Sequence, residues 1–80
     1  MPMENSEYFI TGMRYRILRI NSRCEWYSNR HAFEGKLMEC VDLFDHESVG
    51  FRFVEQKDCP SEYNFYMAFC FYRAGAEQCP

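Results

Sequence analysis

Hydrophobic positions recur with a period of two along several short segments of this chain, and polar turns separate the segments. Residues 13–20 begin as such an alternation, with Tyr15 and Ile17 on one side, and then change phase. One extra residue in a strand turns every later side chain to the opposite face. We therefore expect a strand over residues 13–20 with a bulge near Ile17, preceded by a short edge strand over residues 8–11.

Two further apolar segments, residues 36–44 and 49–55, flank the polar residues 45–48. Two strands joined by four turn-forming residues make a β-hairpin. The expected core positions of this hairpin are Leu37, Val41, Leu43, Phe51 and Phe53.

Residues 63–72 are the most β-prone run, because aromatic residues dominate it. A helix stays open as an alternative, since rings also recur at spacings of three and four, but such residues are weak helix formers. We expect a strand here, and a C-terminal tail over residues 74–80. In the expected strand over residues 63–72, the side chains facing the core are Phe65, Met67, Phe69 and Phe71. Those facing outward are Tyr66, Ala68, Cys70 and Tyr72.

The connection between the first strand and the hairpin, residues 21–34, is polar and rich in turn-forming residues, yet it contains Trp26, Tyr27 and Phe33. Four or five strands with one long loop after the first are typical of a small barrel. We predict an all-β fold: a small, partly open barrel of four to five antiparallel strands with one long loop, residues 21–34. Its parts are a flexible N-terminus (residues 1–7), a single domain (8–73) and the tail (74–80).

A first strand over residues 15–20, the aromatic-bearing loop and the entry Gly35-Lys36 to the second strand are followed by a hairpin and a last strand. In this pattern, over residues 13–72, the chain resembles the Src-homology-type (SH3-like) and KOW-type small β-barrels. The resemblance implies the fold and carries no diagnostic functional motif.

A chain of 80 residues has room for one core. No run of about 18 apolar residues is present, so no membrane span is expected. Five cysteines form an odd set without the dense spacing of secreted disulfide frameworks, which favours reduced thiols and a cytoplasmic location. Whether Cys59 and Cys79 pair stays open.

The candidate chemistry is sparse. No two cysteines show zinc-knuckle spacing, and glycine-rich phosphate loops are absent, so we expect neither metal nor cofactor. Cys24 and His31 are the one thiol–imidazole pair close in a loop, and nothing in the sequence positions them for catalysis. We expect a non-enzymatic protein.

Tryptophan, tyrosine and arginine dominate interface hot spots, and the long loop concentrates them. A protein partner is therefore the first expectation, with a homodimer as an extension through outward tyrosines. The partner-binding set is Arg23, Trp26, Tyr27, Arg30, Phe33, Tyr66 and Tyr72.

The chain is acidic, with net charge −3, but residues 1–36 hold six basic and four acidic residues, whereas residues 37–80 hold three basic and eight acidic ones. The basic half supports a nucleic-acid-binding barrel as the alternative, because arginines beside stacking rings are what single strands require. Its residues are Arg14, Arg16, Arg19, Arg23 and Arg30, with Trp26 and Tyr27 as stacking rings. The acidic half predicts an acidic surface: Asp42, Asp45, Glu47, Glu55 and Asp58.

The expected function is stoichiometric association with a macromolecular partner. The finer hypothesis is an inhibitor of a host defence protein, of phage or mobile-element origin and similar in role to anti-CRISPR proteins, because small size, a clustered aromatic loop and an acidic surface suit that role. A second alternative is an oligomeric sponge for a small anionic signal molecule.

Overall fold

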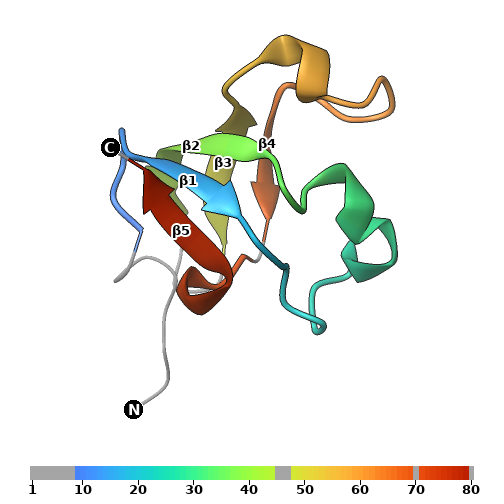
Figure 1. The fold of residues 1–80 in the computed structure, drawn as a ribbon, viewed down its shortest axis with the longest axis horizontal. Helices are drawn as coiled ribbons and strands as arrows, with labels where there is room; N and C mark the ends of the chain where they lie inside the picture. Colours follow the sequence, from blue (N-terminus) through green and yellow to red (C-terminus); the bar gives the residue numbers. More distant parts are fainter. Residues whose placement is uncertain (1–8, 45–47, 70, 80) are drawn as a thin grey trace.

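The computed structural model describes residues 9–44, 48–69 and 71–79, and five strands dominate them (Figure 1). They are β1 (Arg14–Ile17), β2 (Leu37–Leu43), β3 (Val49–Phe53), β4 (Tyr66–Phe69) and β5 (Ala76–Cys79). Three short 3₁₀ helices lie in the connections: η1 (Tyr27–Ala32), η2 (Gln56–Asp58) and η3 (Arg73–Gly75).

The strands form one sheet in the order β4-β3-β2-β1-β5, and every neighbouring pair is antiparallel. The predicted small all-β fold is confirmed. Among the described residues β4 and β5 are the two edges and do not pair with each other, so the sheet is not a closed barrel.

The C-terminal boundary predicted from sequence is wrong. Residues 76–79, assigned there to a tail, form β5 and pair with β1 from Ile17 opposite Ala76 to Arg14 opposite Cys79. Only Ala76 of this strand is buried. A short edge strand with one apolar anchor lacks the alternation by which a strand is recognised. The predicted flexible residues 1–7 lie outside the described residues.

The first strand is also shorter than predicted. It ends at Ile17, and the next amides bond elsewhere: those of Leu18 and Arg19 both donate to the carbonyl of Gly75. Ile20, which lies in the connection after β1, is buried in the core. The change of phase therefore marks the departure of the chain from the sheet and not a bulge at Ile17.

A bulge does occur, in β2 between Cys40 and Asp42. Before it, Met38 and Cys40 face the core and are fully buried, while after it Leu43 packs against the core. The predicted core positions Leu37 and Val41 are only half-buried. The bulge shifts the alternation by one residue, which is why sequence periodicity selected the wrong face for most of β2.

The run over residues 63–72 contains a strand, as predicted in preference to a helix, but only β4 within it is regular. Tyr66 points outward, Phe65 packs against the core from a half-buried position, and Phe71 is buried beyond the strand. The side chains of Met67, Ala68, Phe69 and Cys70 lie outside the described part of the chain.

The core is mainly aromatic and covers one face of the sheet. Phe9, expected in an edge strand, is not in a strand; Tyr8 lies outside the described residues. The Phe9 ring packs edge-on against Tyr15 and Phe51, with centroids 5.0 and 5.1 Å away. Phe33 and Phe71 extend this network with centroids 5.8 Å apart. Such edge contacts each contribute about 0.5–1.5 kcal/mol beyond area burial, so the core is specific in shape.

Candidate interaction surface

The long connection between β1 and β2 is folded onto the core by three buried anchors. Ile20 and Cys24 are 2% and 3% exposed, and Phe33 is fully buried. The connection ends in a turn in which the Lys36 amide donates to the Phe33 carbonyl and Gly35 adopts a φ of 86°, which favours glycine. The loop predicted without secondary structure thus contains η1 and is anchored to the core by buried side chains (Figure 1).

Two large rings stay at the surface of this connection. Trp26 is 36% and Tyr27 37% exposed. The Trp26 ring meets Tyr63 edge-on at 5.7 Å, and Tyr63 in turn contacts Phe33 at 5.3 Å. The Arg30 guanidinium lies 4.9 Å from the Tyr27 ring centroid, a cation–π contact. We call Arg23, Trp26, Tyr27, Arg30 and Tyr63 the loop surface.

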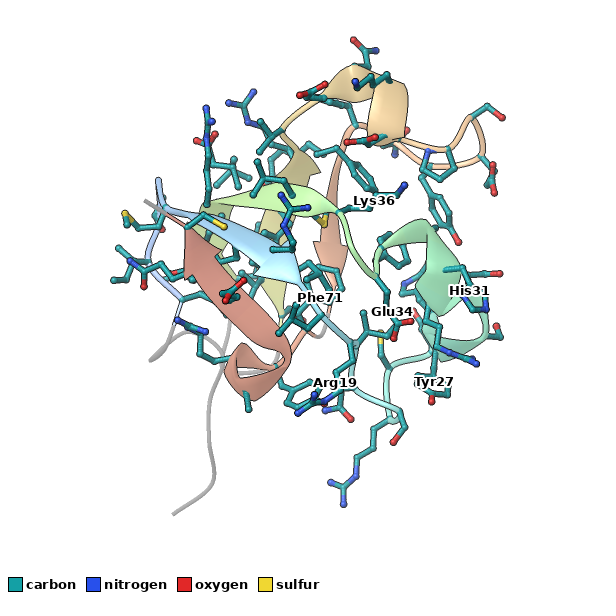
Figure 2. The ribbon with its side chains drawn as sticks, viewed as in Figure 1. Arg19, Tyr27, His31, Glu34, Lys36 and Phe71 are labelled. Carbon is teal, nitrogen blue, oxygen red and sulfur yellow. The ribbon has the colours of Figure 1, made fainter. Side chains whose placement is uncertain are left out.

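Figure 2 shows Tyr27 and His31 on the η1 side of the molecule, with Phe71 inside between this segment and the sheet. His31 is exposed, and η1 has no buried residue. Each side chain of η1 is therefore at least partly accessible, while the anchors on either side of the helix hold its backbone in place.

Three residues of the predicted partner-binding set lie elsewhere. Phe33 belongs to the core and offers no accessible contact. Tyr66 projects from the outer face of the sheet, the face opposite the core. Tyr72 is half-buried, and its hydroxyl accepts a hydrogen bond of 2.8 Å from Nε of Arg19. Within this set Tyr27 and Arg30 are in contact, Trp26 precedes Tyr27 in the chain, and Arg23 is exposed on the same connection.

Tyr63 joins the loop surface from the connection between β3 and β4, and sequence reasoning placed it in a strand. The turn signal Asp58-Cys59-Pro60-Ser61 just before it is the one indication in the sequence that position 63 still belongs to a loop. Its contact with Trp26 is long-range and has no local signature.

The arginines of the nucleic-acid alternative divide between β1 and the loop. Arg14 and Arg16 lie on the outer face opposite Glu39 and Glu77 respectively. Arg14 approaches the Glu39 carboxylate at 3.9 Å, and Arg16 donates to the Gly35 carbonyl. Arg19 is held by Tyr72. Arg14, Arg16 and Arg19 therefore each have a partner within the chain: a carboxylate, a carbonyl and a tyrosine hydroxyl respectively.

The predicted acidic surface is only partly described, because Asp45 and Glu47 lie outside the described residues. Asp42 is exposed and accepts a hydrogen bond from the Leu43 amide. Glu55 pairs with Lys57 at 3.1 Å, and Asp58 is half-buried in η2. The described members thus lie in two places: Asp42 is on β2, and Glu55 and Asp58 are on the connection between β3 and β4.

Cysteines at positions 24, 40, 59 and 79 are free thiols. Cys24 is buried, whereas His31 is exposed. Burial raises the pKa of Cys40, and desolvation together with Glu62 raises that of Cys59. Within residues 9–44, 48–69 and 71–79, no group of three or more His, Cys, Asp or Glu side chains is placed to hold a metal ion.

Comparisons of the chain with protein-family models, with curated proteins and with solved structures found no match. In the described part of the chain no helix has the length and apolar character needed to cross a membrane.

Proposed function

We propose that this chain is a binding protein that associates stoichiometrically with a protein partner through the loop surface. The observation that carries the proposal is the exposed pair of Trp26 and Tyr27 at the start of η1, between the buried anchors Cys24 and Phe33. Tryptophan, tyrosine and arginine are the residue types enriched among the interface residues that contribute most of the binding energy, and Arg30 lies over the Tyr27 ring.

Preorganisation is the physical argument for this surface. A flexible loop would lose conformational entropy on binding, about 0.5–1.5 kcal/mol for each long side chain that becomes ordered. Here Trp26 already packs on Tyr63 and Arg30 on Tyr27 before a partner arrives. A larger share of the contact energy then appears as affinity.

Charge specifies the partner further. Residues 19–36 hold four basic residues and two acidic ones, in a chain of net charge −3. Opposite charge accelerates encounter and suppresses unsuitable partners. An acidic protein surface with a pocket for an indole ring fits this segment best.

The test is site-specific photo-cross-linking from position 28, since Ser28 is exposed and follows Tyr27 in η1. A matched probe replaces Ile10, which is 54% exposed. We expect one protein to be captured from position 28 and not from position 10. The purified protein should then form a complex of fixed stoichiometry with the unmodified chain.

The variants Trp26→Ala and Arg30→Ala combined should weaken that complex at least about tenfold, as loss of a hot spot does. Leu18→Ala, which removes an exposed side chain outside the loop surface, should not. A complex of equal affinity with the double variant would refute the proposal.

Within this proposal, the finer hypothesis is inhibition of a host defence protein by a phage-type protein. It adds one requirement: the captured protein must lose activity in proportion to the amount of chain bound. Activity that persists in the saturated complex would remove the inhibitory role and leave the binding role.

Nucleic acid is the alternative outcome. Titration with single- and double-stranded oligonucleotides at low salt would then show binding that falls steeply as salt is added, because counterions are released. Such binding, lost in the Arg14→Ala and Arg16→Ala double variant, would replace the protein partner.

A further inference from the structure

A second exposed aromatic cluster lies on the outer face of the sheet. Phe44 is 50% and Tyr66 44% exposed, and their rings stack with centroids 6.4 Å apart and planes inclined by 14°. β2 begins at the end of the long connection, and Phe44 follows its last residue. The cluster is thus at the opposite end of β2 from η1.

Gly50 of β3 makes this arrangement fit. A Cβ atom at position 50 would lie 2.8 Å from the Tyr66 hydroxyl and 3.1 Å from Cε2 of Phe44. Without a side chain, the glycine lets both rings lie directly on the strand. The rings are therefore fixed against the backbone and present their other faces to solvent.

Charges of opposite sign flank the two rings. Arg52 is the cross-strand neighbour of Tyr66. Asp42 is the cross-strand neighbour of Gly50, and Gly50 lies under the hydroxyl end of the Tyr66 ring. Arg52 and Arg14 share the Glu39 carboxylate, at 2.9 and 3.9 Å, so this end keeps one net positive charge.

The other end is negative. The described partner of the Asp42 carboxylate is the neighbouring Leu43 amide. Asp42 is the cross-strand neighbour of Gly50, on which the Tyr66 hydroxyl lies, so its carboxylate is near the ring. Desolvation and then the charge of Asp42 raise the pKa of the Tyr66 hydroxyl. The patch therefore runs from positive through apolar to negative.

We propose that this face binds a second copy of the chain, with Phe44 and Tyr66 at the centre of a two-fold symmetric contact. The two-fold axis of such a dimer lies in the contact plane, perpendicular to the line that joins Arg52 to Asp42. Rotation about this axis reverses the direction of that line in the second copy. Arg52 of each copy then faces Asp42 of the other, and the rings of the two copies pack together. A patch with this charge order is complementary to itself.

The size of the cluster sets the strength of the dimer. Four half-exposed rings bury on the order of 400 Å², whereas stable interfaces bury about 1,200–2,000 Å². We infer a weak, concentration-dependent dimer. The dimer contact includes no residue of the loop surface, so its test is independent of the test for the proposed partner.

Sedimentation equilibrium of the intact chain from micromolar to millimolar concentration tests this proposal. We expect a monomer–dimer equilibrium in the natural chain. Phe44→Ala should weaken it about tenfold or more, and Leu18→Ala, which also removes a half-exposed apolar side chain, should leave it unchanged.

Charge reversal gives the sharper result. Asp42→Arg and Arg52→Glu should each weaken the dimer, because like charges then face one another, and the double variant should restore it. The double variant carries the folding costs of both single changes, so its recovery would come from the contact itself. A chain that stays monomeric throughout, or a dimer that the double variant weakens further, would overturn the proposal.

Discussion

Gly75 lies directly against the backbone carbonyl of Arg19, so closely that a Cβ atom at position 75 would overlap the carbonyl oxygen. The same glycine accepts two hydrogen bonds through its own carbonyl, from the amides of Leu18 and Arg19 at 2.8 and 3.1 Å. The end of β1 and the start of β5 are thereby locked together.

Gly75→Ala should therefore destabilise the fold by about 2 kcal/mol or more, because a backbone carbonyl cannot move aside as a side chain would. Urea unfolding followed by fluorescence measures the loss. Ala74→Ser, at the exposed neighbouring position, is the control and should stay within about 0.5 kcal/mol of the natural chain. Equal stability of both variants would contradict the contact.

Phe33→Ala should remove about 3–5 kcal/mol, since it empties a fully buried ring position. Trp26→Ala should cost about 1 kcal/mol, the order of its edge contact with Tyr63. Thermal unfolding of the two variants distinguishes the core residue from the surface residue. A Trp26 variant as unstable as the Phe33 variant would show that the indole belongs to the core.

Tyr15→Phe should cost about 1–3 kcal/mol, because the Tyr15 hydroxyl accepts a 2.9 Å hydrogen bond from the Ile10 amide and the phenylalanine leaves that donor without it. Tyr72→Phe removes an exposed hydroxyl bond to Arg19 and should cost less. Denaturant midpoints for both variants give the comparison, and a larger loss at position 72 would reverse the assignment.

Stability should fall in alkaline solution, in part through Cys40. Burial raises the pKa of this thiol in the folded state above its unfolded value, so the folded state favours the protonated form. The thiol contribution is fully present below the unfolded pKa of about 8.5 and is lost as pH rises through the folded pKa. The free energy of unfolding at neutral pH and at about pH 9.5 should differ less in Cys40→Ala than in the natural chain.

Cys59→Ser is the second variant in that measurement, because desolvation and then the charge of Glu62 raise the pKa of this half-buried thiol as well, so its removal should also reduce the alkaline loss. The Tyr66 hydroxyl is present in the natural chain and in both variants, so its contribution cancels when their changes in unfolding free energy with pH are compared. If removing Cys40 leaves the alkaline loss unchanged, the buried thiol is not its source.

The period-two pattern was enough to predict the all-β class and the hairpin of β2 and β3, because both depend on local alternation and turn residues. It misplaced the core face of β2, since nothing in the residues around Val41 marks the bulge. It missed β5 because pairing with β1 is non-local and only Ala76 contributes an apolar anchor.

The part of the candidate surface that is local in sequence was predictable, and the part that depends on tertiary packing was not. Trp26, Tyr27 and Arg30 are neighbours in sequence, and their exposure follows from a loop too rich in rings for a small core to bury. Tyr63 and the pairing of Phe44 with Tyr66 are products of tertiary packing. Residue type alone placed Phe33 with the binding residues, although its side chain is fully buried against Phe53 and Phe71.

The position of β1 has a kinetic consequence. Its two neighbours are β2, which follows the long connection, and β5, from the far end of the described chain. Closing so wide a loop costs entropy before any contact compensates for it. We therefore expect the β2–β3 hairpin to organise early, and the docking of β5 onto β1 to be a late event on a millisecond-or-slower timescale.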